Sequence, residues 1–223
     1  MKYICQHLGL GDHLICNGLI RTLYKKEEDY TIFVKEKYLE SISFMFRDLS
    51  NFHFITGEAD DNIYFLQKNQ IKSDDIIYAG FTWVDKQKYS FEENFYLQNK
   101  VEFENKWSKF SVKRDKERES DLFKKLKIDE PYIFIHEDKE RGFEINKNLL
   151  PDIRVIKADN SLTNNIFDYL KIMENAHQIH CIESSFLLLA DIMNINSNII
   201  FHSYSRQHPD NFFQPKYKNV KFI

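Results

Sequence analysis

The sequence is poor in residues that cross-link or sharply bend a chain, with three cysteines, six glycines and four prolines among 223 residues. Cys5, Cys16 and Cys181 are odd in number and form no Cys-x-x-Cys pair, which argues against a disulfide framework and a cysteine zinc site. No stretch reaches the roughly 20 apolar residues of a membrane span. The first residues turn polar too soon for a signal peptide. We therefore expect a cytoplasmic protein with no membrane span.

A basic excess is also missing, because the formal net charge is −3. Nucleic-acid binders usually carry a basic patch, so we expect no nucleic-acid partner. The N-terminal glycine turn lacks the third glycine of the dinucleotide fingerprint, and no Gly-Lys-Ser/Thr, Gly-x-Ser-x-Gly or Asp-x-Asp occurs. No histidine pair, His177 and His180 included, has metal-ligand spacing. We expect neither a metal nor a cofactor.

Hydrophobic residues, at 43%, are ample for a packed core. In the first half, apolar helical patterns alternate with predicted strands at 2–7, 30–35, 52–56 and 75–80. This alternation is typical of a parallel sheet with crossover helices. Residues 81–112 then hold both tryptophans, Trp83 and Trp107. We expect a pair of helices there, whose aromatic residues either cover the sheet or line a binding cleft.

The second half of the sequence shows the same alternation of predicted strands and helices. A predicted helix at 115–126 leads into strands at 132–135, 153–157, 178–182 and 198–202, with a possible last strand at 219–223. Helical patterns at 165–176 and 186–193 separate them. The predicted fold class is α/β, with two Rossmann-like lobes facing across a cleft. We expect the N-terminal lobe at 1–125 and the C-terminal lobe at 126–223.

The first candidate site is the turn after the first strand. Gly9, Gly11, Asp12 and His13 stand where an apolar helical pattern begins. Free backbone amides and the positive end of a helix would meet there and hold an anion or a polar sugar. The alternative is that Asp12 is a plain helix cap.

A second candidate is the segment 131–142, which reads PYIFIHEDKERG. Its apolar start predicts a strand buried on both faces. The charged turn that follows brings His136, Arg141 and Gly142 to the carboxyl end of that strand, where ligands bind in open α/β sheets. The arginine fork suits a phosphorylated ligand. The alternative is a solvated loop.

A third candidate follows the strand at 178–182, where Glu183, Ser184 and Ser185 lead into a helix. Two hydroxyls and free amides make a phosphate seat, although a serine N-cap needs no ligand. Three further residues close other strands or start a helix, and each is a predicted ligand contact or a structural residue. They are Lys157, Asn165 and His202, the last followed by a polar, cation-bearing tail that ends at Arg206.

These pieces resemble a known family. The opening KYICQHLGLGDHLICNGLIRTL resembles the glycine turn of GT-B-type glycosyltransferases, especially the heptosyltransferase-like group, where Gly-x-Gly-Asp begins the first helix of the acceptor-side lobe. NIFDYLKIMENAHQIHCIESSFLLLADIM resembles their C-terminal lobe, where a Ser-Ser or Ser-Thr turn binds the donor diphosphate. PYIFIHEDKERGF is similar to the first strand and loop of that lobe, where a basic residue meets the diphosphate.

The resemblance implies a small, metal-independent glycosyltransferase. It would use a nucleotide sugar as donor and a glycan or lipid-linked acceptor. Asp12 or His13 is the implied general base, beside the turn shaped by Gly9 and Gly11. Arg141 and Lys157 would neutralise the leaving nucleoside diphosphate. The remaining implied substrate contacts are His136, Gly142, Asn165, Glu183, Ser184, Ser185 and His202.

The chain also departs from the family pattern. It is short for a two-lobed transferase, and the proline that usually follows the turn is absent. The donor sugar, the base and the acceptor therefore stay open. Two other functions remain: a nucleotide-sugar epimerase, which needs acid and base groups around one sugar carbon, and a non-catalytic nucleotide-sugar-binding module.

Overall fold

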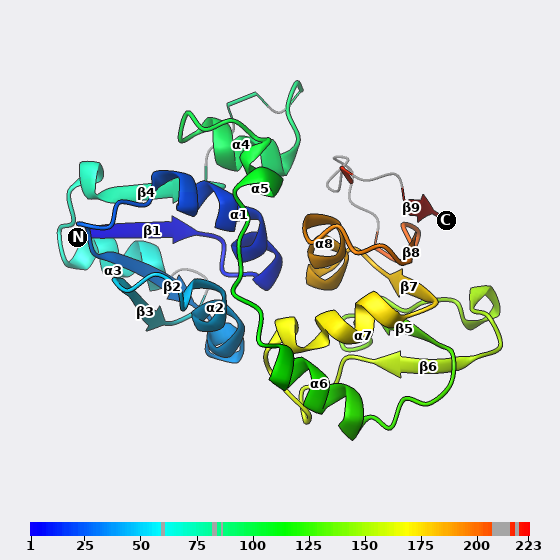
Figure 1. The fold of residues 1–223 in the computed structure, drawn as a ribbon. Helices are drawn as coiled ribbons and strands as arrows, with labels where there is room; N and C mark the ends of the chain where they lie inside the picture. The colour runs from blue at the N-terminus through cyan, green and yellow to red at the C-terminus, as the bar shows by residue number, and fades with distance from the viewer. Residues whose placement is uncertain (59–60, 82–83, 86, 207–214, 217–218) are drawn as a thin grey trace. The chain divides into compact units, whose positions relative to one another are not determined.

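A computed structural model describes residues 1–58, 61–81, 84–85, 87–206, 215–216 and 219–223 (Figure 1). Trp83 lies outside the described residues. The chain forms two compact units, Met1–Lys113 and Arg114–Ile223. Each unit has its own parallel sheet, so the predicted α/β class with two Rossmann-like lobes is confirmed. Each unit is described by itself below.

The sheet of the first unit is parallel, in the order β3-β2-β1-β4. The inner strand β1 has buried Ile4 and Cys5 at its centre and pairs with β2 from Lys2↔Tyr30 and with β4 up to Gln6↔Ala79. The long helix α1 is buried on all sides over its middle part, including Leu14, Ile15 and Leu19. The elements are β1 (Lys2–Gln6), α1 (Leu10–Leu23), β2 (Tyr30–Val34), α2 (Leu39–Phe46), β3 (Phe52–Thr56), α3 (Asp61–Lys68) and β4 (Ile76–Ala79).

The aromatic segment after β4 contains the predicted pair of helices, α4 (Phe91–Leu97) and α5 (Asn105–Ser108). A capping box between Ser90 and Glu93 starts α4. Phe95 and Tyr96 are fully buried, and Tyr96 donates to the main-chain oxygen of Ile15 at 2.6 Å. These aromatic residues therefore belong to the core, as the first of the two sequence interpretations expects.

The sheet of the second unit is also parallel, in the order β6-β5-β7-β8-β9. Its inner strand β5 has the run Tyr132–Ile135, all buried, which fits a strand covered on both faces. The elements are α6 (Lys116–Lys125), β5 (Tyr132–His136), β6 (Arg154–Lys157), a 3₁₀ turn (Ile166–Tyr169), α7 (Leu170–Asn175), β7 (Gln178–Cys181), α8 (Ser185–Ile192), β8 (Asn198–Phe201) and β9 (Val220–Phe222).

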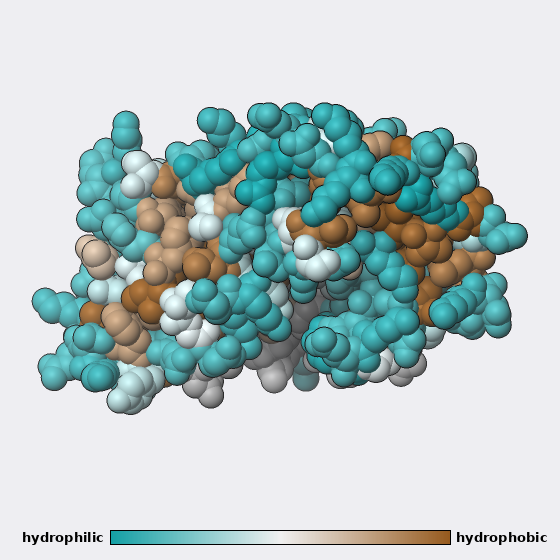
Figure 2. All heavy atoms as spheres, turned by 90° about the horizontal axis from the view of Figure 1, so that it is seen from below, coloured by the Kyte–Doolittle hydropathy of each residue, from teal (hydrophilic) through white to brown (hydrophobic). Residues whose placement is uncertain are grey.

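Helix α6 packs with the second unit, because Arg118 on α6 donates to Asp168 at 2.8 Å and Arg114 pairs with Glu119 and Glu174. The lobe limits predicted from the sequence, 1–125 and 126–223, would place α6 in the first lobe. The division into an acceptor-side and a donor-binding lobe stays a prediction. Figure 2 shows hydrophilic side chains over much of one face, with hydrophobic patches between them. Among the described residues, no helix combines the length and the apolar character needed to cross a bilayer.

Candidate functional site

In the first unit, the turn after β1 folds the Asp12 side chain back over its own helix start. Gly9 is the N-cap of α1, and the His13 N–H donates to the Gly9 oxygen at 3.2 Å. A Cβ on Gly9 would lie 2.5 Å from Asp12 Oδ2, so a larger residue would displace the carboxylate. Gly11 and Asp12 lie half-buried in the first turn. Gly9, Gly11 and Asp12, which are predicted to shape the acceptor side, therefore lie together in the turn that begins α1.

His13 does not belong to an accessible group. It is fully buried, and its Nδ1 contacts the side-chain amide of Gln6, which is also buried. Burial lowers the pKa of His13 to about 3, because a charged imidazole would lose its hydration there. A ring enclosed in the core cannot reach a substrate hydroxyl. We therefore retain only Asp12 of the two predicted bases.

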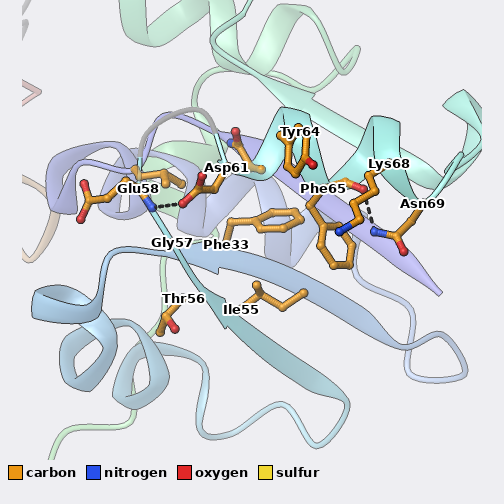
Figure 3. Close-up of a pocket in the computed structure, with 12 residues that line it drawn as sticks. Phe33, Ile55, Thr56, Gly57, Glu58, Asp61, Tyr64, Phe65, Lys68 and Asn69 are labelled. Carbon is orange, nitrogen blue, oxygen red and sulfur yellow. Dashed lines mark hydrogen bonds between the residues drawn. The ribbon is translucent and has the colours of Figure 1, made fainter.

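A separate cavity of about 410 Å³ lies between α3 and the strands β2 and β3 (Figure 3). Phe33, Ile55 and Phe65 form its apolar wall, while Glu58 and Asp61 stand at one end, joined by a 2.7 Å bond from the Glu58 N–H to Asp61 Oδ2. None of the site residues predicted from the sequence lines this cavity. The candidate site is therefore built on other elements.

In the second unit, four neighbouring parallel strands end at one edge of the sheet. The registers Ile135↔Lys157 and His136↔Cys181 bring the carboxyl ends of β6, β5 and β7 side by side, and Cys181↔Phe201 adds β8. Lys157, His136 and the Glu183–Ser185 turn consequently lie at the same edge. The gathering of these segments is confirmed, because parallel strands share their carboxyl edge.

The cations of this edge already have acidic partners. Arg141 binds Asp138 at 2.5 Å, and Lys157 Nζ binds Glu137 at 2.6 Å. Burial by itself would raise the pKa of Glu137, but bonds from Lys157 and from the main chain of Ile145 bring it below the usual value. The side chains of Arg141 and Lys157 are 60% and 45% exposed. Both can therefore exchange a carboxylate for an incoming anion.

Arg206, in the tail after β8, was not among the predicted site residues. Its Nη1 donates to the main-chain oxygen of Glu183 at 3.2 Å, directly before the Ser-Ser turn. Its guanidinium lies 5.5 Å from the ring centre of Phe143, and that of Arg141 lies 5.6 Å from the same ring. Among the described residues, Arg206 makes no ion pair with an acid. The contact joins the loop after β5 to the tail after β8.

His136 Nδ1, Ser184 Oγ and Ser205 Oγ are buried polar atoms of these loops that have no hydrogen-bond partner among the described residues. Ser184 is the N-cap of α8, yet its side chain makes no capping bond. A buried polar group left unpaired costs about 1–3 kcal/mol. Ser184 therefore does not act as the ordinary serine cap that the alternative interpretation expects, and its hydroxyl has no hydrogen-bond partner among the described residues.

The contacts and burial of the remaining predicted residues at this edge, His136, Gly142, Glu183 and Ser185, are as follows. The His136 ring packs against Phe186, with centroids 4.6 Å apart, and burial lowers the pKa of His136 to about 4. Ser185 opens α8 and is half-buried, and Glu183 is buried. Gly142 has φ +76°, which suits glycine and lets residues 138–143 turn back on themselves through a pair of 2.8 Å main-chain bonds.

Two predicted ligand contacts are structural instead. Asn165 is fully buried, where its Oδ1 accepts from the Phe167 N–H and its Nδ2 donates to Asp168. His202 is fully buried as well, with both ring nitrogens engaged, by His180 and by Tyr204, at 2.9 Å each. Neither side chain has a free polar atom for a substrate. Both side chains make structural hydrogen bonds here, and the substrate contacts of Asn165 and His202 stay predictions.

The chemistry of the edge is that of an anion site. The unpaired hydroxyl of Ser184 stands at the start of α8, where main-chain N–H groups also lack helical partners. Arg206, Arg141 and Lys157 add positive charge in the neighbouring loops and strand ends. Such a set can hold a phosphate or diphosphate through charge-assisted hydrogen bonds. Among the described residues, no group of three His, Cys, Asp or Glu side chains could hold a metal ion.

Comparison with solved structures gives two similar chains. The glycosyl transferase family 9 protein from Veillonella parvula DSM 2008 matches 100% of this chain and 86% of its own, at TM-score 0.57 and 10% identity. ADP-heptose LPS heptosyltransferase II from E. coli matches 100% of this chain and 90% of its own, at TM-score 0.58 and 10% identity. No family model and no curated protein matches the sequence. The resemblance to heptosyltransferase-like GT-B proteins is confirmed at the level of the fold.

Proposed function

We propose that the chain is a glycosyltransferase that moves a sugar from a nucleoside-diphosphate donor to a hydroxyl group of a glycan or lipid-linked acceptor, without a metal. The single observation that carries the proposal is the uncapped, buried hydroxyl of Ser184 at the start of α8. It lies at the strand edge where Arg206 contacts the preceding residue. The fold shared with two glycosyltransferases supports the same assignment.

In the proposed reaction, the second unit stabilises the leaving group. The bond between the sugar carbon and the diphosphate oxygen breaks, and negative charge accumulates on the nucleoside diphosphate. Ser184, the N–H groups of the first turn of α8 and the guanidinium groups of Arg141 and Arg206 would meet this charge. Lys157 would exchange Glu137 for a phosphate oxygen. The absence of Asp-x-Asp from the sequence agrees with a mechanism in which cationic side chains replace a metal.

The first unit would supply the base. Asp12 is a half-buried carboxylate at the start of α1, held over Gly9. It would take the proton of the acceptor hydroxyl while that oxygen forms the new bond to the sugar carbon. The products are the glycosylated acceptor, the nucleoside diphosphate and a protonated Asp12, which releases its proton to solvent.

The test begins with the full chain and calorimetry against ADP, GDP, UDP, CDP and dTDP. We expect one of them to bind, and Arg141→Ala to weaken that binding by about 1.5–3 kcal/mol, the range for a hydrogen bond to a charged group. Lys124→Ala, which removes an exposed cation from α6, is the matched control and should leave the affinity unchanged. Wild-type affinity in Arg141→Ala would count against the site.

Turnover separates the three candidate functions. With a panel of nucleotide sugars, a transferase releases free nucleoside diphosphate, an epimerase forms an isomeric nucleotide sugar, and a binding module does neither. Asp12→Asn should retain donor binding and lose turnover. If Asp12→Asn instead fails to fold, Asp12 is only a helix cap, and the assignment of the base is wrong.

A further inference from the structure

Glu137 places a buried carboxylate at the carboxyl edge of the second sheet, directly after β5. Its side chain is 7% exposed, and its Oε2 accepts the Ile145 N–H at 3.1 Å. Its Oε1 accepts from Lys157 Nζ at 2.6 Å, and Lys139 Nζ lies 3.6 Å from the same oxygen. Two ammonium groups and one main-chain N–H therefore surround a single carboxylate. Donors of this kind also bind phosphate oxygens.

The carboxylate is the fixed partner of this group, and Lys157 is the movable one. The bond from Ile145, whose own side chain is buried in the core, holds Glu137 in place. Lys157 ends β6 with an exposed side chain, and its ammonium is carried by a flexible four-carbon stem. Among the described residues, Lys157 pairs with no acid other than Glu137. Rotation about the bonds of its stem takes the ammonium from Glu137 to a ligand at the same edge.

Lys139 keeps the cost of this exchange low. A buried carboxylate that loses its cation is normally strongly destabilised. When Lys157 turns to a ligand, however, Glu137 retains the Ile145 N–H and the ammonium of Lys139 at 3.6 Å. Lys139 is exposed, and its other acidic contact, Glu144, is 3.9 Å away, so it can move closer to Glu137. Both arrangements of the two lysines therefore leave the buried carboxylate compensated.

We infer that Glu137 is an internal competitor of the nucleoside diphosphate: its carboxylate holds Lys157 in the free protein, gives it up when the diphosphate binds, and takes it back as the product leaves. The inference rests on the proposed transferase function and concerns the regulation of that same site. Glu137 acts through Lys157 and is a positioning residue. Because the carboxylate and the diphosphate need the same cation, each lowers the affinity of Lys157 for the other.

The test compares the full wild-type chain with Glu137→Gln by calorimetry against ADP, GDP, UDP, CDP, dTDP and inorganic pyrophosphate. Glutamine has the shape of glutamate but no charge and only one acceptor oxygen, so it cannot serve both the Ile145 N–H and Lys157. We expect the nucleoside diphosphate that binds to do so about tenfold more tightly, the lower limit for a hydrogen bond to a charged group. Its dissociation, followed by stopped flow, should slow. Wild-type affinity in Glu137→Gln overturns the inference.

Two controls separate competition for Lys157 from a simple loss of negative charge. Glu144→Gln removes the same charge from an exposed position of the same loop and should change the affinity by less than about twofold. In a Lys157→Met background there is no ammonium to share, so adding Glu137→Gln should leave the affinity where Lys157→Met put it. An equal gain in both backgrounds means that Glu137 acts through its charge alone, which overturns the inference.

A further measurement needs no change at Glu137. Reductive methylation with ¹³C-formaldehyde keeps the charge of each lysine, and Lys157→Arg identifies the Lys157 signal by its loss. Pyrophosphate should shift the NMR signal of Lys157 and leave that of Lys124, which pairs with Asp121 on α6, unchanged. A Lys157 signal that stays in place while pyrophosphate binds overturns the inference, even where Glu137→Gln fails to fold.

The outcomes also distinguish the competitor from the transferase. Nucleoside-diphosphate binding that Glu137→Gln leaves unchanged rejects the competitor and retains the transferase. Pyrophosphate binding that Glu137→Gln tightens, without binding of any nucleoside diphosphate, rejects the transferase and retains the competitor. Binding of neither pyrophosphate nor a nucleoside diphosphate to either protein overturns both.

Discussion

Arg206 donates from Nη1 to the main-chain oxygen of Glu183 at 3.2 Å and so ties the tail after β8 to the turn before α8. The contact brings a cation that has no acidic partner among the described residues to the start of a helix whose N-cap hydroxyl is also unpaired. The combination supports the proposed anion site of the second unit, which neither segment would form alone.

Arg206→Ala should weaken nucleoside-diphosphate binding more than Arg141→Ala does. Arg141 must leave Asp138 before it can bind a phosphate, whereas Arg206 has no such partner to leave. We expect a loss of about 3 kcal/mol, the upper end of the range for a hydrogen bond to a charged group, measured by calorimetry. Arg206→Lys keeps the charge and should recover part of the affinity, because an ammonium group lacks the bidentate fork. An Arg206→Ala protein with unchanged affinity would remove Arg206 from the site.

The free energy of unfolding should decrease as the pH is lowered from 7.5 to 5. Gln178, His180, His202 and Tyr204 form a hydrogen-bonded chain whose two imidazoles are buried, and a neutral tautomer of each imidazole satisfies it. Burial lowers the pKa of each histidine from 6.5 to about 4, with the neighbouring His180 adding to the effect on His202. Below pH 6.5 the unfolded chain therefore binds protons that the folded chain does not, and stability falls until the pH reaches the folded pKa.

Urea unfolding at a series of pH values measures this effect. We expect a loss of about 2 kcal/mol per histidine between pH 7.5 and 5, because pH 5 lies about 1.5 units below the unfolded pKa and each unit is worth about 1.4 kcal/mol. The double variant His180→Leu, His202→Leu should show a flatter pH dependence, whatever its absolute stability. His53→Gln, at an exposed histidine, should retain the full slope. An equal slope in the double variant would show that other groups cause the pH dependence.

The ion pair of Lys106 and Glu92 is buried completely in the first unit, with the Lys106 ammonium over the ring of Trp107 at 4.8 Å. Lys106→Met should lower the free energy of unfolding by about 3–5 kcal/mol, because the buried carboxylate of Glu92 loses the cation that compensates its charge. The double variant with Glu92→Met should recover most of that loss. Lys124→Met breaks the exposed pair with Asp121 and should cost less than about 1 kcal/mol. A double variant no more stable than Lys106→Met would contradict this account.

Gly18 lies where α1 meets α5, and a Cβ there would be 2.0 Å from the main-chain oxygen of Asn105. Gly18→Ala should therefore destabilise the protein by about 1–3 kcal/mol, the cost of overpacking a core. The usual effect of this change inside a helix is a gain of stability. Gly142→Ala, where nothing lies within 4 Å of the added Cβ, isolates the cost of a positive φ. Thermal unfolding of both variants measures the difference, and a raised midpoint in Gly18→Ala would be inconsistent with the contact.

Local pattern was enough to locate the regular elements. The strand expected at 132–135 is Tyr132–His136, and the helix expected at 115–126 is Lys116–Lys125. Buried strands and capped helices depend on a few neighbouring residues, which the sequence displays directly. The helix expected at 165–176 begins instead as a 3₁₀ turn, Ile166–Tyr169, which precedes α7. The order of the strands in each sheet follows from contacts distant in sequence and was not predicted.

The candidate site could be predicted only in part from the sequence, because the direction of each side chain also depends on contacts distant in sequence. His136, Lys157 and Ser184 were found because each follows a recognisable strand. His13, Asn165 and His202 stand at equally suitable positions in the sequence, but their side chains turn into the core, which only packing decides. Arg206 was named as part of a polar tail, yet its contact with Glu183 requires the turn of the chain after β8. The contact of His7 Nε2 with the main-chain oxygen of Gly80 likewise joins segments more than 70 residues apart.

The aromatic ring that two guanidinium groups share at Phe143 also offers an optical signal. Both tryptophans of the chain belong to the sequence of the first unit, so the second unit has no indole emission of its own. In the variant Phe143→Trp, a fluorophore would stand between the cations that a diphosphate draws away. Its intensity would then follow ligand occupancy of that unit in real time, without a labelled nucleotide.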